Sequence, residues 1–470
     1  MRHACLVLLG ALCAPGVFAA DGDIDSSFGD TGLAMTGLID AGGAVCGPLV
    51  QPDGKILVCN SRQANGSSGS DFFVARFTAD GQLDPSFSFD GRTTIDFDGG
   101  VGIDAAGGME LYPDGRIIVV GTTASSQSFD SQTRDFAIAR LLPDGSLDTS
   151  FGSGTGKKTV AFNLDTDTGL GDDTAIDVAI QPNGRIVVAG TAQLSQATGN
   201  NDFAVTRLLA DGTPDASFNL SGKATLAFDL ASSTSKSDRL QAMALDESGR
   251  ILLAGSANKQ ADDTDFAFAR LLANGQPDPD FDADGRTTLA FDLGETDADT
   301  LSGISLQRDG KLVAIGMAAR PTGSNNDWAI ARLLPDGTPD ATFGVLGQTV
   351  LAFDLTADGA DTGLSIIEDP AGRLLLCGAA QWLGSPGYAV AAAFARLDRH
   401  GEPDPTFGVL GKRTFQFGLS AADSQAFLGI AFQRSQPVVS GISIVAGVDN
   451  PIDNFLVRLE TDLIFANGFE

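Results

Sequence analysis

The sequence predicts an all-β fold made of repeated four-stranded antiparallel sheets, and three observations support this prediction. Variants of a D-F-x-x-x-R pattern and a D-x-[STD]-F pattern each recur seven times along the 470 residues. Both patterns have a period of roughly 64 residues, which is the signature of a repeat architecture. Each period holds four runs rich in Val, Ile, Leu, Phe and Thr, separated by turn-forming residues. The marker residues are Arg76, Arg140, Arg207, Arg270, Arg332, Arg396 and Arg458 in the first pattern, and Phe28, Phe87, Phe151, Phe218, Phe281, Phe343 and Phe407 in the second.

The third unit illustrates the expected strands. They are residues 175–181, 185–190, 202–209 and 223–230. The first two flank a Pro-Asn-Gly turn at Gly184, a hairpin signal because Asn-Gly tolerates positive φ at both central positions. The third strand is mostly apolar on both faces. A strand of this kind is covered on both sides, so we expect each sheet to lie between two others.

Four-stranded sheets repeated radially form the blades of a β-propeller. Each marker occurs seven times, so the sequence predicts seven blades. The half-unit 21–38 supplies the fourth, outermost strand of the last blade, and the first three strands come from about 425–460. We therefore expect the segment Thr31 to Leu38 to lie beside the strand that carries Arg458. This closure removes open sheet edges, whereas the alternative, an open solenoid, would call for distinct capping repeats.

The first residues have the features of a secretory signal peptide. Arg2 precedes an apolar stretch at 4–13, and small residues lead to a cleavage point after Ala19. No other window approaches the roughly 18 apolar residues of a membrane-spanning helix. We expect a monomer that is exported to the periplasm, the cell surface or the medium. The expected division is a signal peptide at 1–19, one propeller built from the repeats of roughly 64 residues at 20–462, and a short tail at 463–470.

The chain is strongly acidic, with a formal net charge of −30. A surface of this charge repels nucleic acid and anionic membranes and attracts cationic groups. The composition therefore argues against a nucleic-acid partner. It leaves open whether the charge serves a cationic ligand or solvation alone.

Three cysteines follow the expected signal peptide. Cys59 and Cys377 occupy the same repeat position, which small apolar residues fill in other units, so we predict that they are core residues. Cys46 lies across the first hairpin from Cys59, but its spacing about the Asp53-Gly54 turn is off register by a residue or two. We do not expect a disulfide there, although an oxidising compartment would allow one.

The repeated arginines have two interpretations. They could bind a ligand, or each could be held between blades by carbonyls or a carboxylate, since a buried guanidinium must be satisfied. Residues that are the same in every blade describe the blade, so we favour the structural role. In the loop that follows, we predict that the second Asp (Asp148 and Asp340, for example) caps backbone amides and that Phe151 or Phe343 fills the blade.

The sequence shows no catalytic motif. His400, the one histidine after the signal peptide, stands in a turn. No nucleophile elbow or phosphate-binding loop occurs. Catalysis by carboxylates alone stays open, but no pair is distinguished, so no catalytic, cofactor-binding or metal-binding residue is assigned.

Calcium is the alternative to having no cofactor. The turn Asp280 to Gly285 matches D-x-D-x-D-G, but Phe291 stands where a calcium loop carries a bidentate Glu.

The units resemble the delta-60 repeat family of bacterial exported proteins. The resemblance rests on QPDGKILV (51–58), DFAIARLLPDGSLDTSFG (135–152) and DWAIARLLPDGTPDATFG (327–344), and it extends over nearly the whole chain. It implies a secreted or surface-associated propeller without an assigned activity, and it implies no catalytic residues. The sixth unit departs from the pattern with Ala391 in place of Asp.

The variable loops predict where a site would be. Loops between the second and third strands, and from the fourth strand to the next unit, share one rim, and binding residues favour variable loops on a rigid scaffold. The first set comprises 60–70, 191–201, 318–326 and 379–388; the second is acidic and includes Asp165, Asp167, Asp172, Asp173, Glu295, Asp297 and Asp299.

From this rim we predict a binding or interaction module that is not an enzyme. Its partner would be a protein, a glycan or a cationic ligand, and a cleft lined by Trp328, Trp382 or Tyr388 would favour a glycan or peptide. The first alternative is an extracellular polysaccharide hydrolase or lyase with carboxylates at the channel mouth. The second is a structural cell-surface protein.

Overall fold

The computed structural model describes residues 21–36, 45–63, 69–99, 102–124, 134–165, 171–195, 198–230, 236–260, 263–293, 298–320, 325–356, 359–383, 388–417, 423–444 and 452–461. Regular structure in these stretches is β-strand, apart from one short 3-10 helix, η1 (Gly152–Gly154). No helix in this part of the chain has the length and apolarity needed to cross a membrane.

The strands fall into groups of four. The first strands are β2 (Cys46–Val50), β6 (Ile103–Leu111), β10 (Thr174–Ile180), β14 (Asp238–Leu245), β18 (Asp299–Leu306), β22 (Asp361–Glu368) and β26 (Ser424–Gln433). The second strands are β3 (Ile56–Gln63), β7 (Ile117–Ala124), β11 (Ile186–Ser195), β15 (Ile251–Gln260), β19 (Leu312–Ala319), β23 (Leu374–Leu383) and β27 (Gln436–Ile444). The third strands are β4 (Ser70–Phe77), β8 (Arg134–Leu141), β12 (Asn200–Leu208), β16 (Asp263–Leu271), β20 (Asn326–Leu333), β24 (Tyr388–Leu397) and β28 (Ile452–Arg458). The fourth strands are β5 (Arg92–Ile95), β9 (Lys157–Val160), β13 (Lys223–Leu226), β17 (Arg286–Leu289), β21 (Gln348–Leu351), β25 (Lys412–Phe415) and β1 (Leu33–Met35).

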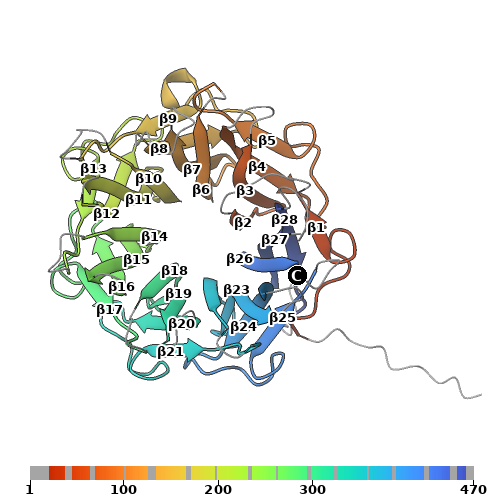
Figure 1. Ribbon diagram of the computed structural model, residues 1–470. Helices are drawn as coiled ribbons and strands as arrows, with labels where there is room; N and C mark the ends of the chain where they lie inside the picture. Colours follow the sequence, from red (N-terminus) through yellow and green to blue (C-terminus); the bar gives the residue numbers. More distant parts are fainter. Residues whose placement is uncertain are drawn as a thin grey trace, which may run out of the picture.

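Strands that are consecutive in a group pair antiparallel, which confirms the predicted all-β fold of four-stranded sheets. Five sheets have four strands each, and β2 to β9 form one larger sheet. That sheet is two groups joined at a single parallel pairing, between Ser70 in β4 and Ile103 in β6. The first strands lie nearest a common centre and the fourth strands at the periphery (Figure 1).

A β-bulge recurs in the first strands from β6 to β26. In each, the register against the second strand shifts by one residue. A bulge leaves its extra residue unpaired and re-aims that side chain. The unpaired residues are Gly107, Ile176, Gln241, Ser302, Leu364 and Leu428.

The repeated Phe fills the junction between two units. Phe151 is fully buried, and a Cβ added at Gly212 of the next unit would lie 2.8 Å from its ring. Gly212 also has a φ of +86°, so the turn needs glycine for conformation and for close approach. The other Phe–Gly contacts of this kind are Phe28–Gly81, Phe87–Gly145, Phe218–Gly275, Phe281–Gly337, Phe343–Gly401 and Phe407–Gly22.

The repeated Arg is structural, as predicted. Arg140 is buried, and its Nε donates to Asp148 Oδ2 at 2.8 Å. Its Nη1 donates to the Ala210 carbonyl of the next unit. The partner Asp lies eight residues on and is not the Asp of the same D-F-x-x-x-R pattern. Equivalent sets are Arg76–Asp84–Pro143, Arg207–Asp215–Ala273, Arg270–Asp278–Pro335 and Arg332–Asp340–Arg399.

A second contact between units was not foreseen. The side chain that opens a fourth strand donates to a backbone carbonyl just past the fourth strand of the preceding unit. Lys157 Nζ, for example, donates to the carbonyl of Asp96, which fixes the backbone at that residue. The other pairs are Arg92–Thr36, Lys223–Ala161, Arg286–Ala227, Gln348–Ala290 and Lys412–Ala352.

The opening segment adds to the last sheet. β1 pairs antiparallel with β28, with Leu33 opposite Val457 and Met35 opposite Phe455, in agreement with the position expected for this part of 31–38; Leu38 lies outside the described residues. Three nearby aspartates each pair with an arginine from the last part of the chain. These pairs are Asp21–Arg396, Asp23–Arg413 and Asp25–Arg458.

The prediction about the first hairpin was wrong. Cys46 lies directly opposite Cys59, and the two form a disulfide with their Cα atoms 4.9 Å apart. A register shift between Cys46 and Leu49 absorbs the offset that the spacing implied. Cys377 is a buried free thiol, as predicted, and burial raises its pKa.

Candidate functional site

Buried aspartates line the junctions at the rim with the variable loops. Asp104, at the start of β6, is 0% exposed, and its Oδ2 accepts the Phe97 N–H at 2.8 Å. Because the contact needs only an acceptor, a glutamine can replace the carboxylate, and Gln425 accepts the Phe417 N–H in the same way. The other members of the set are Asp173–Phe162, Asp238–Phe228, Asp299–Phe291 and Asp361–Phe353.

A second aspartate stands at the start of most third strands. Asp71 lies opposite Arg62 of β3, and its equivalents are Asp135, Asp202, Asp265 and Asp327. Burial raises the pKa of Asp135 and brings that of Asp202 to about 6. Each of these junctions therefore carries two carboxylates.

One junction carries a third carboxylate. Asp96 follows β5, where the equivalent residues are Ala161, Ala227, Ala290, Ala352 and Gln416. One carboxylate oxygen each from Asp71, Asp96 and Asp104 lies within 4.8 Å of the others. This Asp71–Asp96–Asp104 cluster is where the chemistry of the rim departs from the repeat.

Burial and neighbouring charge raise the pKa of two members of the cluster. Burial raises the pKa of Asp71, and the charges of Asp96 and Asp98 raise it further, whereas Arg62 and Lys157 act in the opposite direction. Burial is also the main cause that raises the pKa of Asp104 to about 7, against hydrogen bonds from Thr123 and Phe97. Asp71 and Asp96 are half-buried and keep contact with solvent.

A cavity of about 620 Å³ is lined by Arg62, the cross-strand partner of Asp71, although none of the three aspartates lines it. Its lining includes Arg62 and Phe73, which share a sheet face with Asp71, because Arg62 is its cross-strand partner and side chains alternate along β4. Phe89 also lines the cavity and is 97% exposed. The cavity thus holds a cation and an apolar ring, and Arg62 connects it to Asp71.

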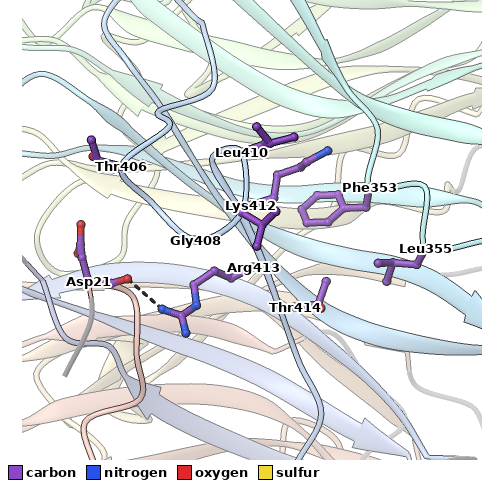
Figure 2. Close-up of a pocket in the computed structure, with 10 residues that line it drawn as sticks. Asp21, Phe353, Leu355, Thr406, Gly408, Leu410, Lys412, Arg413 and Thr414 are labelled. Carbon is purple, nitrogen blue, oxygen red and sulfur yellow. Dashed lines mark hydrogen bonds between the residues drawn. The ribbon is translucent and has the colours of Figure 1, made fainter. Parts of the chain in front are cut away.

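The largest of the described cavities, about 780 Å³, lies between the outer strands of two other units. Figure 2 shows its lining, with Arg413 bonded to Asp21 and with Lys412 beside the Phe353 ring. Exposed Val345 and Leu346 occupy the same turn in the preceding unit as Val409 and Leu410. This cavity therefore follows the repeat, and it holds no cluster of carboxylates among the described residues.

The aromatic residues expected at a rim cleft do not form one. Trp328 is 0% exposed, packs against Phe353 with ring centroids 4.7 Å apart, and donates to the Ala379 carbonyl. It belongs to the core because the strand around it is buried on both faces. Trp382 is half-buried, and the side chain of Tyr388 lies outside the described residues.

The remaining predicted positions contribute turns. His400 lies in the exposed turn after β24, where its amide donates to Asp398. In the turn from Asp280 to Gly285, Asp284 accepts the Arg286 N–H, and Phe291 is buried. Asp172, Asp173 and Asp299 lie at the variable rim as expected, whereas Asp167, Glu295 and Asp297 fall outside the described residues.

The comparisons with known proteins agree with the fold. Five segments match the family described as "Domain of unknown function (DUF5122) beta-propeller", at residues 51–87, 113–151, 181–218, 247–281 and 307–343. The matched segments are therefore similar to the repeats of a propeller family. No curated protein matches the sequence.

Solved structures with a similar arrangement include carbohydrate-active enzymes. An ulvan lyase, from a family of polysaccharide lyases, is 11% identical to this chain. The alignment covers 93% of this chain and 94% of the lyase, with a TM-score of 0.47. An α-L-arabinofuranosidase from Fusarium graminearum is 11% identical, and the alignment covers 80% of this chain and 97% of that chain with a TM-score of 0.42. An α-L-arabinanase from Penicillium chrysogenum is 9% identical, and the alignment covers 74% of this chain and 91% of that chain with a TM-score of 0.41. At these values the likeness concerns the fold.

These findings correct the prediction of a binding module that is not an enzyme. The three structures named above are glycan-cleaving enzymes, whereas the prediction was a module without a catalytic role. That prediction took the lack of histidine, serine and phosphate-loop motifs as a lack of catalytic groups. Aspartate is so frequent in this chain that a functional carboxylate does not stand out in the sequence.

Proposed function

We propose that the protein is an exported carbohydrate-active enzyme, a hydrolase or lyase that cleaves an extracellular polysaccharide with carboxylates. The observation that supports the proposal is the Asp71–Asp96–Asp104 cluster, next to which Arg62 lines a cavity of about 620 Å³. Carboxylates whose environments push their pKa values apart are the acid and base groups that glycan-cleaving enzymes use. The site is on the variable rim between two units and not at the channel mouth.

The two half-buried carboxylates divide the chemistry. The raised pKa of Asp71 favours its protonated form, so Asp71 donates a proton to the glycosidic oxygen as the bond to the leaving sugar breaks. Asp96 is the base. In hydrolysis it attacks the anomeric carbon, and water later displaces it; in elimination it removes the C5 proton of a uronate while the bond to O4 breaks. Asp104 acts as a positioning residue, because it holds the Phe97 amide next to Asp96.

The spacing of the carboxylates bears on the hydrolytic route. Carboxyl groups in retaining enzymes lie about 5–5.5 Å apart, and in inverting enzymes about 6.5–9.5 Å. Oxygens of the cluster lie within 4.8 Å of one another, which favours the retaining arrangement with Asp96 as nucleophile.

The scaffold of the proposal is a closed ring of seven blades of the delta-60 type, exported by the signal peptide at 1–19. Contacts between the last and first units support closure. Ser440 Oγ donates to the Gly47 carbonyl at 2.8 Å, and Gln433 Nε2 donates to the Gly54 carbonyl at 2.6 Å. The Phe407 ring also packs against Gly22, as the other repeated Phe rings pack against glycines. Such a ring would hold the cluster rigidly.

The test is a cleavage assay on a panel of neutral, uronate-containing and sulfated polysaccharides. New reducing ends report either reaction, and absorbance of an unsaturated sugar reports elimination alone. Wild-type protein cleaves at least one polymer, and Asp96→Asn lowers that rate by about 100-fold or more, the range for a lost acid or base.

Asp202→Asn is the matched control, because Asp202 occupies the position of Asp71 at a junction with alanine in place of Asp96. It should cleave like the wild type. Equal loss in both variants, or no cleavage of any polymer by folded wild-type protein, would contradict the proposal.

A further inference from the structure

A second cavity on the variable rim also breaks the repeat. It measures about 250 Å³ and lies where β8, the β10–β11 hairpin and β14 meet. Arg134 and Arg239 line it from two different units, together with Gln193, Asn201 and Gln241. Its lining is thus rich in hydrogen-bond donors.

The residues of this cavity are exceptions at their repeat positions. Where Arg239 stands, the other first strands carry Ala105, Thr174, Thr300, Thr362 and Ala426. Where Arg134 stands, the other third strands carry Ser70, Asn201, Thr264, Asn326, Val390 and Ile452. Gln241 is the unpaired residue of the β14 bulge. Residues that a blade needs recur in every blade, so this local set serves something other than the fold.

The two arginines differ from the repeated, buried arginines in their exposure and in their ion pairs. Arg134 Nε lies 3.3 Å from Asp172 Oδ1, and both side chains are partly exposed. Arg239 is exposed and has no ion pair among the described residues. In a chain of net charge −30, an anion approaches against a repulsive field. The lining of this cavity carries two arginines against one aspartate, Asp172, so its own charge is net positive.

We infer that this cavity is a subsite for an anionic sugar, and that the substrate class is a uronate-bearing or sulfated polysaccharide. The planar guanidinium fork matches carboxylate and sulfate oxygens in bidentate geometry, and the amides of Gln193 and Gln241 suit sugar hydroxyls. The inference rests on the proposed function and deepens it. The catalytic cavity is consistent with it, because Arg62 and Arg92 line that space.

The test is calorimetric binding of three defined probes to the wild-type protein. They are an oligogalacturonate, its carboxyl-reduced neutral counterpart, and a sulfated galactan oligosaccharide of equal length. We expect at least one anionic probe to bind about tenfold or more tightly than the neutral one, as a charge-assisted bidentate contact allows. Preference for the carboxylate probe or the sulfate probe identifies the anionic group.

Two variants locate the subsite. Arg239→Gln should weaken anionic binding about tenfold and leave neutral binding unchanged. Arg308→Gln is the control, because Arg308 is also exposed but lies in the turn between β18 and β19, and it should bind like the wild type. Equal affinity for charged and neutral probes, or equal behaviour of the two variants, overturns the inference.

The outcome is separable from that of the proposed function. Asp96→Asn should keep anionic binding while losing cleavage. If the wild type binds an anionic probe through Arg239 but cleaves no polymer, the subsite stands and the catalytic proposal fails. If cleavage is lost in Asp96→Asn but Arg239→Gln binds and cleaves normally, the catalytic proposal stands and the subsite fails.

Discussion

Two neighbouring junctions of this protein share their scaffold contacts and differ in the charged residues at the variable rim. The junction between β2–β5 and β6–β9 brings together Asp71, Asp96 and Asp104. The next junction has Asp135 and Asp173 in the same places but Ala161 in the middle. Both junctions have the buried repeated Arg, a Phe ring packed against a glycine of the next unit, and a lysine that donates to a backbone carbonyl of the preceding unit. The shared contacts therefore describe the scaffold, and Asp96 in place of alanine marks the candidate chemistry.

The comparison predicts its largest effect in catalysis. Asp71→Asn removes the proton donor and should lower polysaccharide cleavage by about 10²–10⁴-fold. Asp135→Asn, the same change one junction along, should leave the rate within about twofold, since no catalytic partner stands beside it. Initial rates at saturating polymer check this pair. A similar loss in both variants would show that the carboxylates act through folding.

The scaffold contacts should respond alike at both junctions. Arg76→Met and Arg140→Met each leave a buried aspartate, Asp84 or Asp148, without its main cation. Breaking such a pair costs about 3–5 kcal/mol, so we expect both variants to lower the free energy of unfolding by similar amounts. Urea unfolding measures this. The solvent-exposed pair Lys236–Asp229 gives the control: Lys236→Met should cost about 1 kcal/mol or less.

The second junction should reveal the cost of a buried carboxylate. Burial raises the pKa of Asp173 to about 6, above its unfolded value. The folded state thus binds more protons in this window, and stability falls as pH rises from about 4 to about 6 and stays lowered above it. Asp173→Asn keeps an acceptor for the Phe162 N–H, as Gln425 does for Phe417. It should raise the free energy of unfolding by about 1–3 kcal/mol at pH 8 and by little at pH 4, measured by urea unfolding.

The smallest expected effect comes from building the missing carboxylate. Ala161→Asp places a third charge near Asp135 and Asp173, so the pKa of Asp135 should rise further, by about one unit. Carboxyl carbon chemical shifts followed against pH measure it. An unchanged pKa of Asp135 would mean that the residue after the fourth strand does not control its neighbour, which would weaken the same argument for Asp96 and Asp71.

Most of the scaffold was readable from the sequence because it is repeated. The seven Arg and Phe markers predicted the strands and the structural role of the arginines. The strands of the third unit were placed to within a few residues, except that β13 ends at Leu226 and β11 extends to Ser195. The Cys46–Cys59 disulfide was missed because a register shift cannot be counted from spacing.

The candidate site was not readable in the same way. Asp96 is one aspartate among many, and its signal is a departure from the alanine that four other units carry after the fourth strand. That signal is present in the sequence but gains meaning only when Asp71 and Asp104 are found beside it. The prediction for Trp328 was wrong for the opposite reason. A rare aromatic residue suggested a surface role, whereas the fold buries it.

The most direct test of the account is a crystal structure of Asp96→Asn with a bound oligosaccharide taken from the polymer that the wild type cleaves. The account predicts a glycosidic oxygen within hydrogen-bonding distance of the Asp71 carboxyl, with sugar in the cavity lined by Arg62. Sugar bound only at the central channel or on the opposite rim, away from Asp71, would contradict it.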